Sequence, residues 1–416
     1  MRSPVTRVIF ATVLSGVFTY VFLGTVSRSL DASQFDVFSI IWSVSLIIGF
    51  GLFLPVEQEL SRLGGSGALP EAAGRAGVRI AAELALGTLV LLGIAAPLLV
   101  GNGVAVQVVL LSGALVVVSA VQFTARGYLL AGGRLKRYAD VLTVDSILRV
   151  MLALVVALTI GRGLPADAAL FAIGLAVAIL LAHLPVLGGL RAVPGTRAPI
   201  PVVRAAVISL VGGTLSAQVL LNVGPLLIGA LSETAGAAGA FQATFSVARI
   251  PLFMLVPLQA ALVAPLAAQV AAGRTSEMIR LMLTIAGAIA GLAIVGAAVA
   301  GWLGPWIIGL VFGQGRALAA PLVALLVAGV FVHVGLVVST QALIGAGRHR
   351  QASTAWIAAV LVFAATVLIL RPSIGIVPSV SVAFAGGSLI GWGVGLLSLV
   401  AAGRAHRASR GDHPGR

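Results

Sequence analysis

The chain has 416 residues, of which 60% are hydrophobic and only 9% charged, and its mean hydropathy is +1.14. This composition excludes a water-soluble globular protein, because one aqueous core cannot bury so much apolar surface. The absence of cysteine excludes disulfides, thiolate metal sites and cysteine nucleophiles, so redox chemistry is not expected. A net charge of +14 would favour nucleic acid as partner of a soluble protein. Here the basic residues lie between apolar runs, where they set topology, and nucleic acid is not expected as a partner.

Twelve apolar segments are long enough to cross a membrane, since a spanning helix needs about 20 mostly apolar residues. The first of them carries no cleavage pattern of a signal peptide and is predicted to be a helix. The fold class is therefore all-α and transmembrane, with an even number of helices and both termini on one side. The predicted helices cover residues 8–26, 35–55, 78–100, 104–123, 141–160, 168–190, 205–231, 239–264, 278–302, 317–340, 355–370 and 380–402.

Basic residues fall almost entirely into alternate loops, 20 against 4. The positive-inside rule then places both termini and the arginine-rich loops in the cytoplasm of a bacterial cell, with the chain in its plasma membrane. The poor set consists of Arg28, Arg162, Arg316 and Arg371. The rich set consists of Arg2, Arg7, Arg62, Arg75, Arg79, Arg126, Arg134, Lys136, Arg137, Arg191, Arg197, Arg204, Arg274, Arg280, Arg348, Arg350, Arg404, Arg407, Arg410 and Arg416.

The two halves of the chain resemble each other. The stretch from Gly101 to Arg137 is similar to that from Gly313 to Arg350, with Gly133 set against Gly347. The stretch FLGTVSRSL from Phe22 has a counterpart in LIGALSETA from Leu227. We therefore predict two six-helix bundles related by a pseudo-two-fold axis along the membrane normal, because six crossings return the chain to its starting side. The predicted parts are a first bundle (1–190), a cytoplasmic linker (191–204), a second bundle (205–402) and a basic cytoplasmic tail (403–416).

Four stretches carry a family resemblance. They are SLDASQFDVFSIIWSVSLIIGFGLFLPVEQELSR from Ser29, ARGYLLAGGRLKRYADV from Ala125, GPLLIGALSETAGAAGAFQATFSVARIPLFMLVPLQAALVAPLA from Gly224, and WIIGLVFGQGRALAAPLVALLVAG from Trp306. Together they touch most of the chain, which resembles a polysaccharide or oligosaccharide flippase of the Wzx type, within the multidrug/oligosaccharidyl-lipid/polysaccharide exporter superfamily.

This resemblance implies two bundles in a V and a lipid-linked glycan as substrate, carried by undecaprenyl pyrophosphate or a comparable lipid. Membrane lipids and a glycan polymerase or glycosyltransferases would be the other partners. The chain departs from the family in two ways. It has twelve predicted helices where peptidoglycan-precursor flippases have fourteen, and Asn222 stands where members often carry an acid. These departures weigh against that substrate and against borrowing the family's ion coupling.

Arg249 is the first candidate substrate-binding residue. We predict it near the middle of the 239–264 helix, followed by Pro251 and Pro257, which interrupt the helix. A charge in hydrocarbon costs about 2.5 kcal/mol or more unless it faces a cavity or a partner. Its guanidinium offers two parallel donors to phosphate oxygens. The structural alternative is an arginine neutralised by helix-end carbonyls or a neighbouring helix.

The other candidate substrate-binding residues form two pairs with i, i+4 spacing. Asp145 and Arg149 are predicted to share one helix face, either as a self-contained ion pair or as part of a cavity wall. Gln218 and Asn222 can bond sugars, although amides between membrane helices more often join helices.

His183 and His333 are expected to be buried, hydrogen-bonded residues rather than metal ligands, and Glu57 and Glu59 are expected in a solvated cytoplasmic loop. No catalytic residue, metal site or cofactor is predicted. The glycine cluster from Gly64 lacks the strand and lysine of a phosphate-binding loop.

These features favour a non-enzymatic transporter that moves a lipid-linked oligosaccharide or polysaccharide precursor by alternating access. The second hypothesis is a multidrug or small-metabolite antiporter of the same superfamily, which should carry buried carboxylates for ion coupling. A polytopic glycosyltransferase would need acidic residues in an outer loop and usually a soluble domain; the first outer loop has Asp31 and Asp36, and nothing else supports this hypothesis. A non-transporting scaffold with the same fold is a further alternative.

Overall fold

The computed structural model describes residues 4–65, 69–95, 103–163, 167–190, 200–252, 275–345 and 347–411. Over these ranges the chain is built from helices, and no strand occurs in them. Within the described ranges, eleven helices are long and apolar enough to span a membrane. The predicted all-α transmembrane class is therefore confirmed. Predicted residues that fall in the gaps, among them Pro257, Arg274 and linker residues 191–199, lie outside the described residues.

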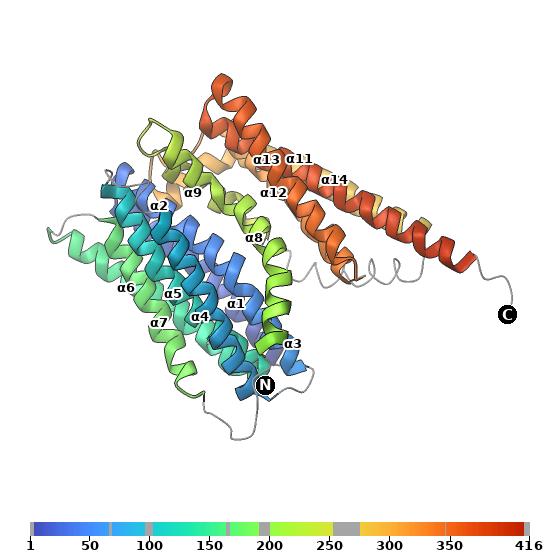
Figure 1. Ribbon diagram of the computed structural model, residues 1–416. Coiled ribbons are helices and arrows are strands. Elements are labelled where there is room, and N and C mark those ends of the chain that lie inside the picture. The colour runs from blue at the N-terminus through green and yellow to red at the C-terminus, as the bar shows by residue number, and fades with distance from the viewer. Residues whose placement is uncertain are drawn as a thin grey trace. The chain divides into compact units, whose positions relative to one another are not determined.

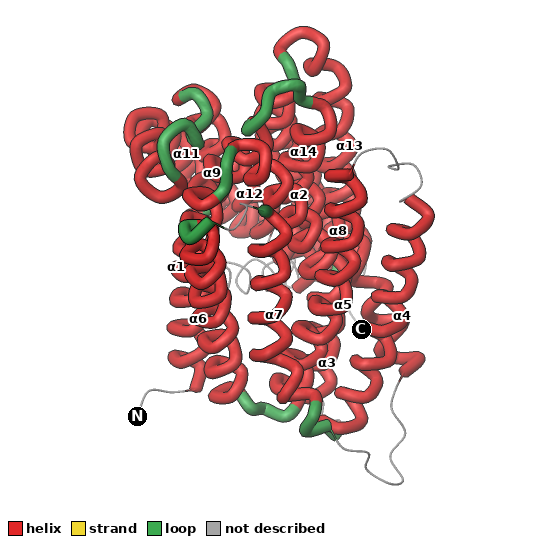
Figure 2. Tube along the Cα trace, turned by 90° about the vertical axis from the view of Figure 1, so that its left-hand side faces the viewer, coloured by secondary structure: helices red, strands yellow, loops and turns green. Residues whose placement is uncertain are grey.

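The chain divides into two compact units, which are described separately. Unit 1 comprises Met1–Gly239 with Val311–Gly313, and unit 2 comprises Ala240–Leu310 with Gln314–Arg416. Figure 1 colours the helices in chain order, and Figure 2 shows that the described elements are helices joined by loops.

Unit 1 contains the helices of the first half. In it α1 packs on α6, α7 on α5 and α6, α4 on α5, and α8 on α2. Its helices are α1 (Pro4–Ser29), α2 (Ala32–Ile48), the π-helical turn η1 (Gly49–Phe53), α3 (Leu54–Gly65), α4 (Pro70–Ala95), α5 (Gly103–Ala131), α6 (Leu135–Ile160), α7 (Ala168–Leu187) and α8 (Ile200–Leu231).

The helix ends of unit 1 follow from local chemistry. Asp31 caps α2 by accepting the Gln34 N–H at 2.8 Å, and Asp167 caps α7 by accepting the Ala169 N–H at 2.8 Å. The turn η1 joins α2 to α3 without a break, so Pro55 begins a helix instead of ending one. The charged residues after Pro55 are consequently helical.

Unit 2 contains most of α9 (Ala237–Ala248) and of α11 (Thr275–Phe312), together with α12 (Ala320–Gly345), α13 (His349–Ile374) and α14 (Ile376–Gly411). Here α14 packs on both α12 and α13. A buried cluster that includes Met282, Val334, Ala342 and Leu399 holds α11, α12 and α14 together. Large apolar side chains on the outer faces, such as Leu368 at 77% exposure, fit a lipid environment.

Most helices are longer than the apolar runs that predicted them, because the backbone hydrogen bonds continue into polar sequence at both ends. Thus α5 ends at Ala131 rather than at Phe123, and α14 continues to Gly411 into the predicted tail. The helix α8 starts at Ile200, inside the predicted linker, and its contacts with α2, α3 and α4 group it with unit 1. The predicted division of the chain at residues 191–204 stays a prediction.

The internal repeat has a structural counterpart in two helical hairpins. Helices α5 and α6 end and begin 214 residues before α12 and α13, since Ala131 corresponds to Gly345 and Leu135 to His349. Both turns use a left-handed glycine, Gly133 with φ 62° and Gly347 with φ 74°. The residue after each glycine makes the same hydrogen bond: the Arg134 N–H donates to Leu129 O at 2.9 Å, and the Arg348 N–H donates to Leu343 O at 2.8 Å. The matched sequences therefore fold into the same turn.

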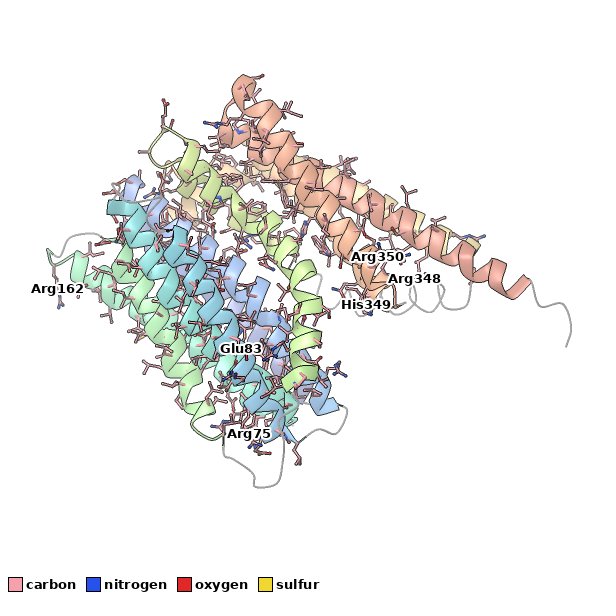
Figure 3. All side chains as sticks on the ribbon, viewed as in Figure 1. Arg75, Glu83, Arg162, Arg348, His349 and Arg350 are labelled. Atoms are coloured by element: carbon pink, nitrogen blue, oxygen red, sulfur yellow. The ribbon has the colours of Figure 1, made fainter. Side chains whose placement is uncertain are left out.

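Figure 3 shows Arg75 and Arg162 at opposite ends of the helices of unit 1, which agrees with their assignment to different sides of the membrane. Within the second hairpin, Arg348 precedes α13 and His349 and Arg350 begin it, next to the glycine turn.

Candidate functional site

A group of buried polar residues lies in the middle of unit 1. Its centre is Asp145 on α6, ten residues after the helix begins, or about 15 Å along its axis. The Asp145 side chain is 2% exposed. Such a carboxylate is costly in hydrocarbon without partners. Its partners therefore define the site.

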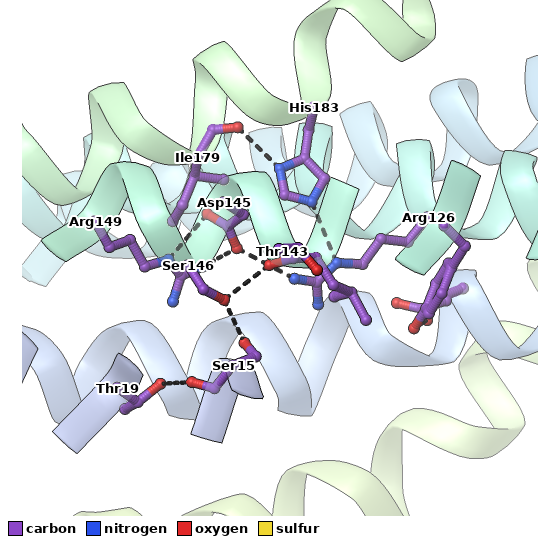
Figure 4. Close-up of polar contacts among 12 residues, drawn as sticks. Ser15, Thr19, Arg126, Thr143, Asp145, Ser146, Arg149, Ile179 and His183 are labelled. Atoms are coloured by element: carbon purple, nitrogen blue, oxygen red, sulfur yellow. Dashed lines mark hydrogen bonds and ion pairs between the residues drawn. The ribbon is translucent and has the colours of Figure 1, made fainter. Parts of the chain in front are cut away.

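Asp145 and Arg149 form the predicted i, i+4 ion pair (Figure 4). Arg149 Nε donates to Asp145 Oδ1 at 2.9 Å, and Arg149 Nη2 donates to Oδ2 at 2.7 Å. The two parallel bonds fix the guanidinium in one plane with the carboxylate. The pair is not self-contained, because residues of α5 bind to it.

Arg126 on α5 supplies a second guanidinium. Its Nη2 lies 3.4 Å from Asp145 Oδ2, and its Nε donates to His183 Nε2 on α7 at 3.2 Å. Gln122, one turn before Arg126, lies against both arginines: with its oxygen turned toward them it accepts from Arg126 at 2.8 Å and from Arg149 at 3.2 Å. Helices α5, α6 and α7 are joined by these contacts.

His183 is buried and hydrogen-bonded, as predicted. Its Nδ1 lies 2.9 Å from Ile179 O, one turn earlier on α7. Since its Nε2 accepts from Arg126, the proton sits on Nδ1 and is donated to Ile179 O, so the ring is neutral. At the other side of α6, the hydroxyls of Ser146 and Ser15 lie 2.6 Å apart and connect α6 to α1.

We call Gln122, Arg126, Asp145, Arg149 and His183 the arginine cluster. It contains two permanent positive charges and one carboxylate, so its net charge is +1. The side chains of Arg126 and Arg149 are 10% and 17% exposed. An uncompensated charge at this depth interacts strongly with any anion that reaches it, because the surroundings have a low dielectric constant.

Arg126 was predicted in a cytoplasmic loop, and this prediction was wrong. The helix does not end where the apolar run ends: α5 continues to Ala131, and the chain turns only at Gly132 and Gly133. These two glycines, six and seven residues after Arg126, are the signal that would have kept it inside the helix.

Glu57 and Glu59 do not lie in a solvated loop, contrary to expectation. They belong to α3 and are 7% and 2% exposed. Glu59 binds Arg62 through two hydrogen bonds of 2.6 and 2.7 Å, and Glu57 accepts a hydrogen bond from the Tyr138 hydroxyl at 2.9 Å. Because η1 joins α2 to α3 without a break, both carboxylates lie on a buried helix.

Gln218 and Asn222 share one face of α8, as predicted. The Asn222 amide donates to Gln218 Oε1 at 2.9 Å, and Asn222 is buried. The bond between them occupies one donor and one acceptor, so part of their capacity for a sugar is already used within the helix.

Arg249 belongs to unit 2 and lies just after the last residue of α9, not inside a helix as predicted. Its backbone N–H continues the helical pattern to Phe245 O at 3.0 Å, and its guanidinium carbon is 4.9 Å from the centre of the Phe245 ring. The twelve residues of α9 rise about 18 Å, roughly half of a 30 Å hydrocarbon core. A cation here is favoured by the negative end of the helix dipole and by the aromatic face.

Solved structures share this arrangement of helices over almost the whole chain. An inward-facing multidrug resistance MATE family transporter of the MOP superfamily is 14% identical, with a TM-score of 0.66 over 98% of this chain and 100% of its own. The chain has the fold of the MATE transporters. A mutant of a Vibrio cholerae MATE transporter is 15% identical with a TM-score of 0.60, over 96% of this chain and 95% of its own.

A third solved structure is a MOP superfamily transporter from Pyrococcus furiosus, described as having a binding pocket of reverse polarity that suggests a different function. It is 14% identical, with a TM-score of 0.62 over 97% of this chain and 96% of its own. Identities this low establish the fold alone.

Curated relatives extend over nearly the same length. Uncharacterised proteins of Mycobacterium bovis and of Mycobacterium tuberculosis H37Rv are each 28% identical to the chain, over 95% of this chain and 91% of their own. No protein-family model matches the chain. The comparisons thus agree with a multi-pass membrane protein of transporter fold.

Proposed function

We propose that the protein is a flippase that translocates a lipid-linked oligosaccharide or polysaccharide precursor across the bacterial plasma membrane by alternating access. The observation that carries this proposal is the charge of the arginine cluster, in which Arg126 and Arg149 share the single carboxylate of Asp145. A surplus positive charge in the membrane suits a phosphate or pyrophosphate head group, the part that lipid-linked glycans have in common.

The second hairpin argues that the cluster is not needed for folding. At the offset of 214 residues, Arg126 corresponds to Thr340, Asp145 to Ala359 and Arg149 to Phe363, and these three are buried without charge. Replacing buried ion pairs by well-packed apolar residues is often neutral or stabilising, by about 1–4 kcal/mol. A fold that builds the same hairpin without charges retains them in the first half for another reason, and substrate binding is that reason in our proposal.

A multidrug antiporter is the alternative, because multidrug transporters are among the structures with this fold. A cationic drug would need an accessible carboxylate, whereas both Asp145 oxygens already accept from guanidinium groups. The reverse polarity described for the Pyrococcus protein makes a change of substrate charge within this fold plausible. A polytopic glycosyltransferase receives no support from these residues. A glycan polymerase or glycosyltransferases remain the proposed partner enzymes.

The test is flipping of a fluorescent lipid-linked glycan in proteoliposomes. We expect wild-type protein to accelerate it and the variant with Arg126→Thr, Asp145→Ala and Arg149→Phe, which carries the residues of the second hairpin, to be folded and inactive. The same vesicles are tested for uptake of a cationic dye. Dye uptake without flipping would support the antiporter, and undiminished flipping by the triple variant would remove the arginine cluster from the substrate path.

The proposed orientation has both termini in the cytoplasm. Because the chain has no cysteine, single cysteines can be introduced without background. A cysteine at Ser232 should react with an impermeant thiol reagent in intact cells, and one at Ser276 should be protected. The opposite labelling pattern would reverse the topology.

A further inference from the structure

Glu57 has a buried carboxyl group, and one of its two oxygens has no hydrogen-bond partner. Its Oε1 accepts the Tyr138 hydroxyl at 2.9 Å, but its Oε2 is buried and has no hydrogen-bond partner. Buried polar atoms are nearly always paired, and an unpaired carboxylate oxygen in the membrane is especially costly. The unpaired Oε2 therefore indicates that Glu57 binds a ligand that is not part of the protein.

Glu57 on α3 interacts electrostatically with the guanidinium of Arg126 on α5. The hydroxyl of Tyr138, on α6, donates a hydrogen bond to Glu57. Arg126 thus interacts with two carboxyl groups, Asp145 and Glu57. Glu57 is coupled to the arginine cluster through it.

Most other charged groups of α3 and of the helices that pack against it have charged partners, and Glu71 stands in the first turn of α4. On α3, Glu59 binds Arg62. Glu83 of α4 binds both Arg79 of α4, at 2.8 Å, and Arg204 of α8, at 2.9 Å. Arg75 of α4 also has partners of its own.

We propose that Glu57 binds a proton together with the anionic group of the substrate, and so sets the charge that the arginine cluster presents. One proton adds to Oε2 of the ionised carboxylate and gives a neutral carboxylic acid. With Glu57 ionised, two arginines face two carboxylates and the net charge is zero. With Glu57 protonated the net charge is +1, and an anion is attracted. This inference rests on the proposed function and adds a coupling ion to it.

A proton suits this position better than a metal cation. Sodium or calcium needs several oxygen ligands around one point. Among the described residues no group of three or more His, Asp or Glu side chains could hold a metal ion. A single unpaired oxygen beside a hydroxyl and a guanidinium has room for a hydrogen atom. By linkage, the proton raises the affinity for the anion and the anion raises the affinity for the proton by the same factor.

The experiment measures proton uptake when the detergent-solubilised full chain binds farnesyl pyrophosphate. Calorimetric titrations in buffers with different ionisation heats give the number of protons bound per ligand. We expect wild-type protein to take up close to one proton more than Glu57→Gln, whose neutral amide imitates the protonated state. Over the pH range where Glu57 ionises, wild-type affinity relative to Glu57→Gln should fall about tenfold per pH unit.

The matched control is Glu59→Gln, which removes a carboxylate two residues away that is already paired with Arg62, and it should behave as wild type. Infrared difference spectra give a second readout. Ligand binding should increase the intensity of the carbonyl band of a protonated carboxyl group in wild type, and Glu57→Asp should shift the frequency of that band.

The outcomes separate the two proposals. Absence of any farnesyl pyrophosphate binding would overturn the proposed function and this inference with it. Binding with equal proton uptake in wild type and Glu57→Gln would overturn this inference alone. If Glu57→Gln does not fold, an unchanged wild-type carbonyl band on ligand binding overturns it, and dependence of affinity on sodium at fixed pH would identify a metal cation instead.

Discussion

The α5–α6 hairpin of unit 1 and the α12–α13 hairpin of unit 2 have the same turn, the same helix limits on either side of that turn at an offset of 214 residues, and different interiors. In the first, Asp145 and two arginines meet between the helices. In the second, His333 lies 3.2 Å from the Ser388 hydroxyl and packs against the rings of Trp356 and Phe384. Backbone geometry is therefore independent of core charge in this fold.

This difference separates what folding requires from what has been added. The left-handed glycines and the helix ends beside the turn recur in both hairpins, so they serve the fold. Arg126, Asp145 and Arg149 have no charged counterparts, and burying them opposes folding unless each is paired. The proposed substrate site is thus the part of the repeat that the second copy lacks.

The largest effect is expected from Asp145→Asn, which leaves two arginines without their shared carboxylate. Breaking a buried ion pair from one side costs about 3–5 kcal/mol, a large share of the stability of a typical domain. We expect a strong loss of folded protein, measured as the monodisperse fraction after size-exclusion chromatography. Asp140→Asn, an exposed site earlier on α6, is the control.

Recovery of folding in the triple variant with the residues of the second hairpin would show that the loss of folded protein comes from the two arginines that lack a carboxylate partner. If Asp145→Asn folds normally and only transport is lost, Asp145 contributes to function without holding the arginines, and the comparison of the two hairpins does not explain it.

The sequence predicted the spanning helices and the turn at Gly133 and Gly347, because apolar runs and glycine positions are local signals. It also predicted the Asp145–Arg149 and Gln218–Asn222 pairs, since i, i+4 spacing places side chains on one helix face. Arg126 and His183 were not assigned to this site. Their partners lie on other helices, and a single sequence does not reveal which helices pack together. Glu57 was misplaced because Pro55 suggested a helix end where the π-helical turn continues the helix.

A smaller effect is expected from Arg249→Ala in unit 2. If Arg249 donates hydrogen bonds to the substrate's phosphate, their loss costs about 1.5–3 kcal/mol, which lowers flipping at least about tenfold. Arg249→Lys should also be impaired, because an ammonium group cannot reproduce two parallel donors. The measurement is flipping by equal amounts of folded protein. Arg371→Ala, at an exposed arginine on α13, is the control, and a normal rate in Arg249→Ala would exclude this residue from the site.

The smallest effects test the shared backbone directly. Gly133 and Gly347 both adopt positive φ, and no atom lies within 4 Å of a Cβ built on either residue, so alanine meets only backbone strain. A left-handed conformation costs an L-residue roughly 1–2 kcal/mol. Gly133→Ala and Gly347→Ala should therefore lower the thermal unfolding temperature in detergent by similar amounts. Gly87→Ala, inside α4 and also in open space, should be neutral or stabilising, because alanine favours a helix over glycine.

Strain is local to the turn, so equal losses are expected whether or not charges lie between the helices. A much larger loss for Gly133→Ala would mean that the first turn also positions Arg126 and Asp145, and that the arginine cluster and the backbone of its hairpin depend on each other after all.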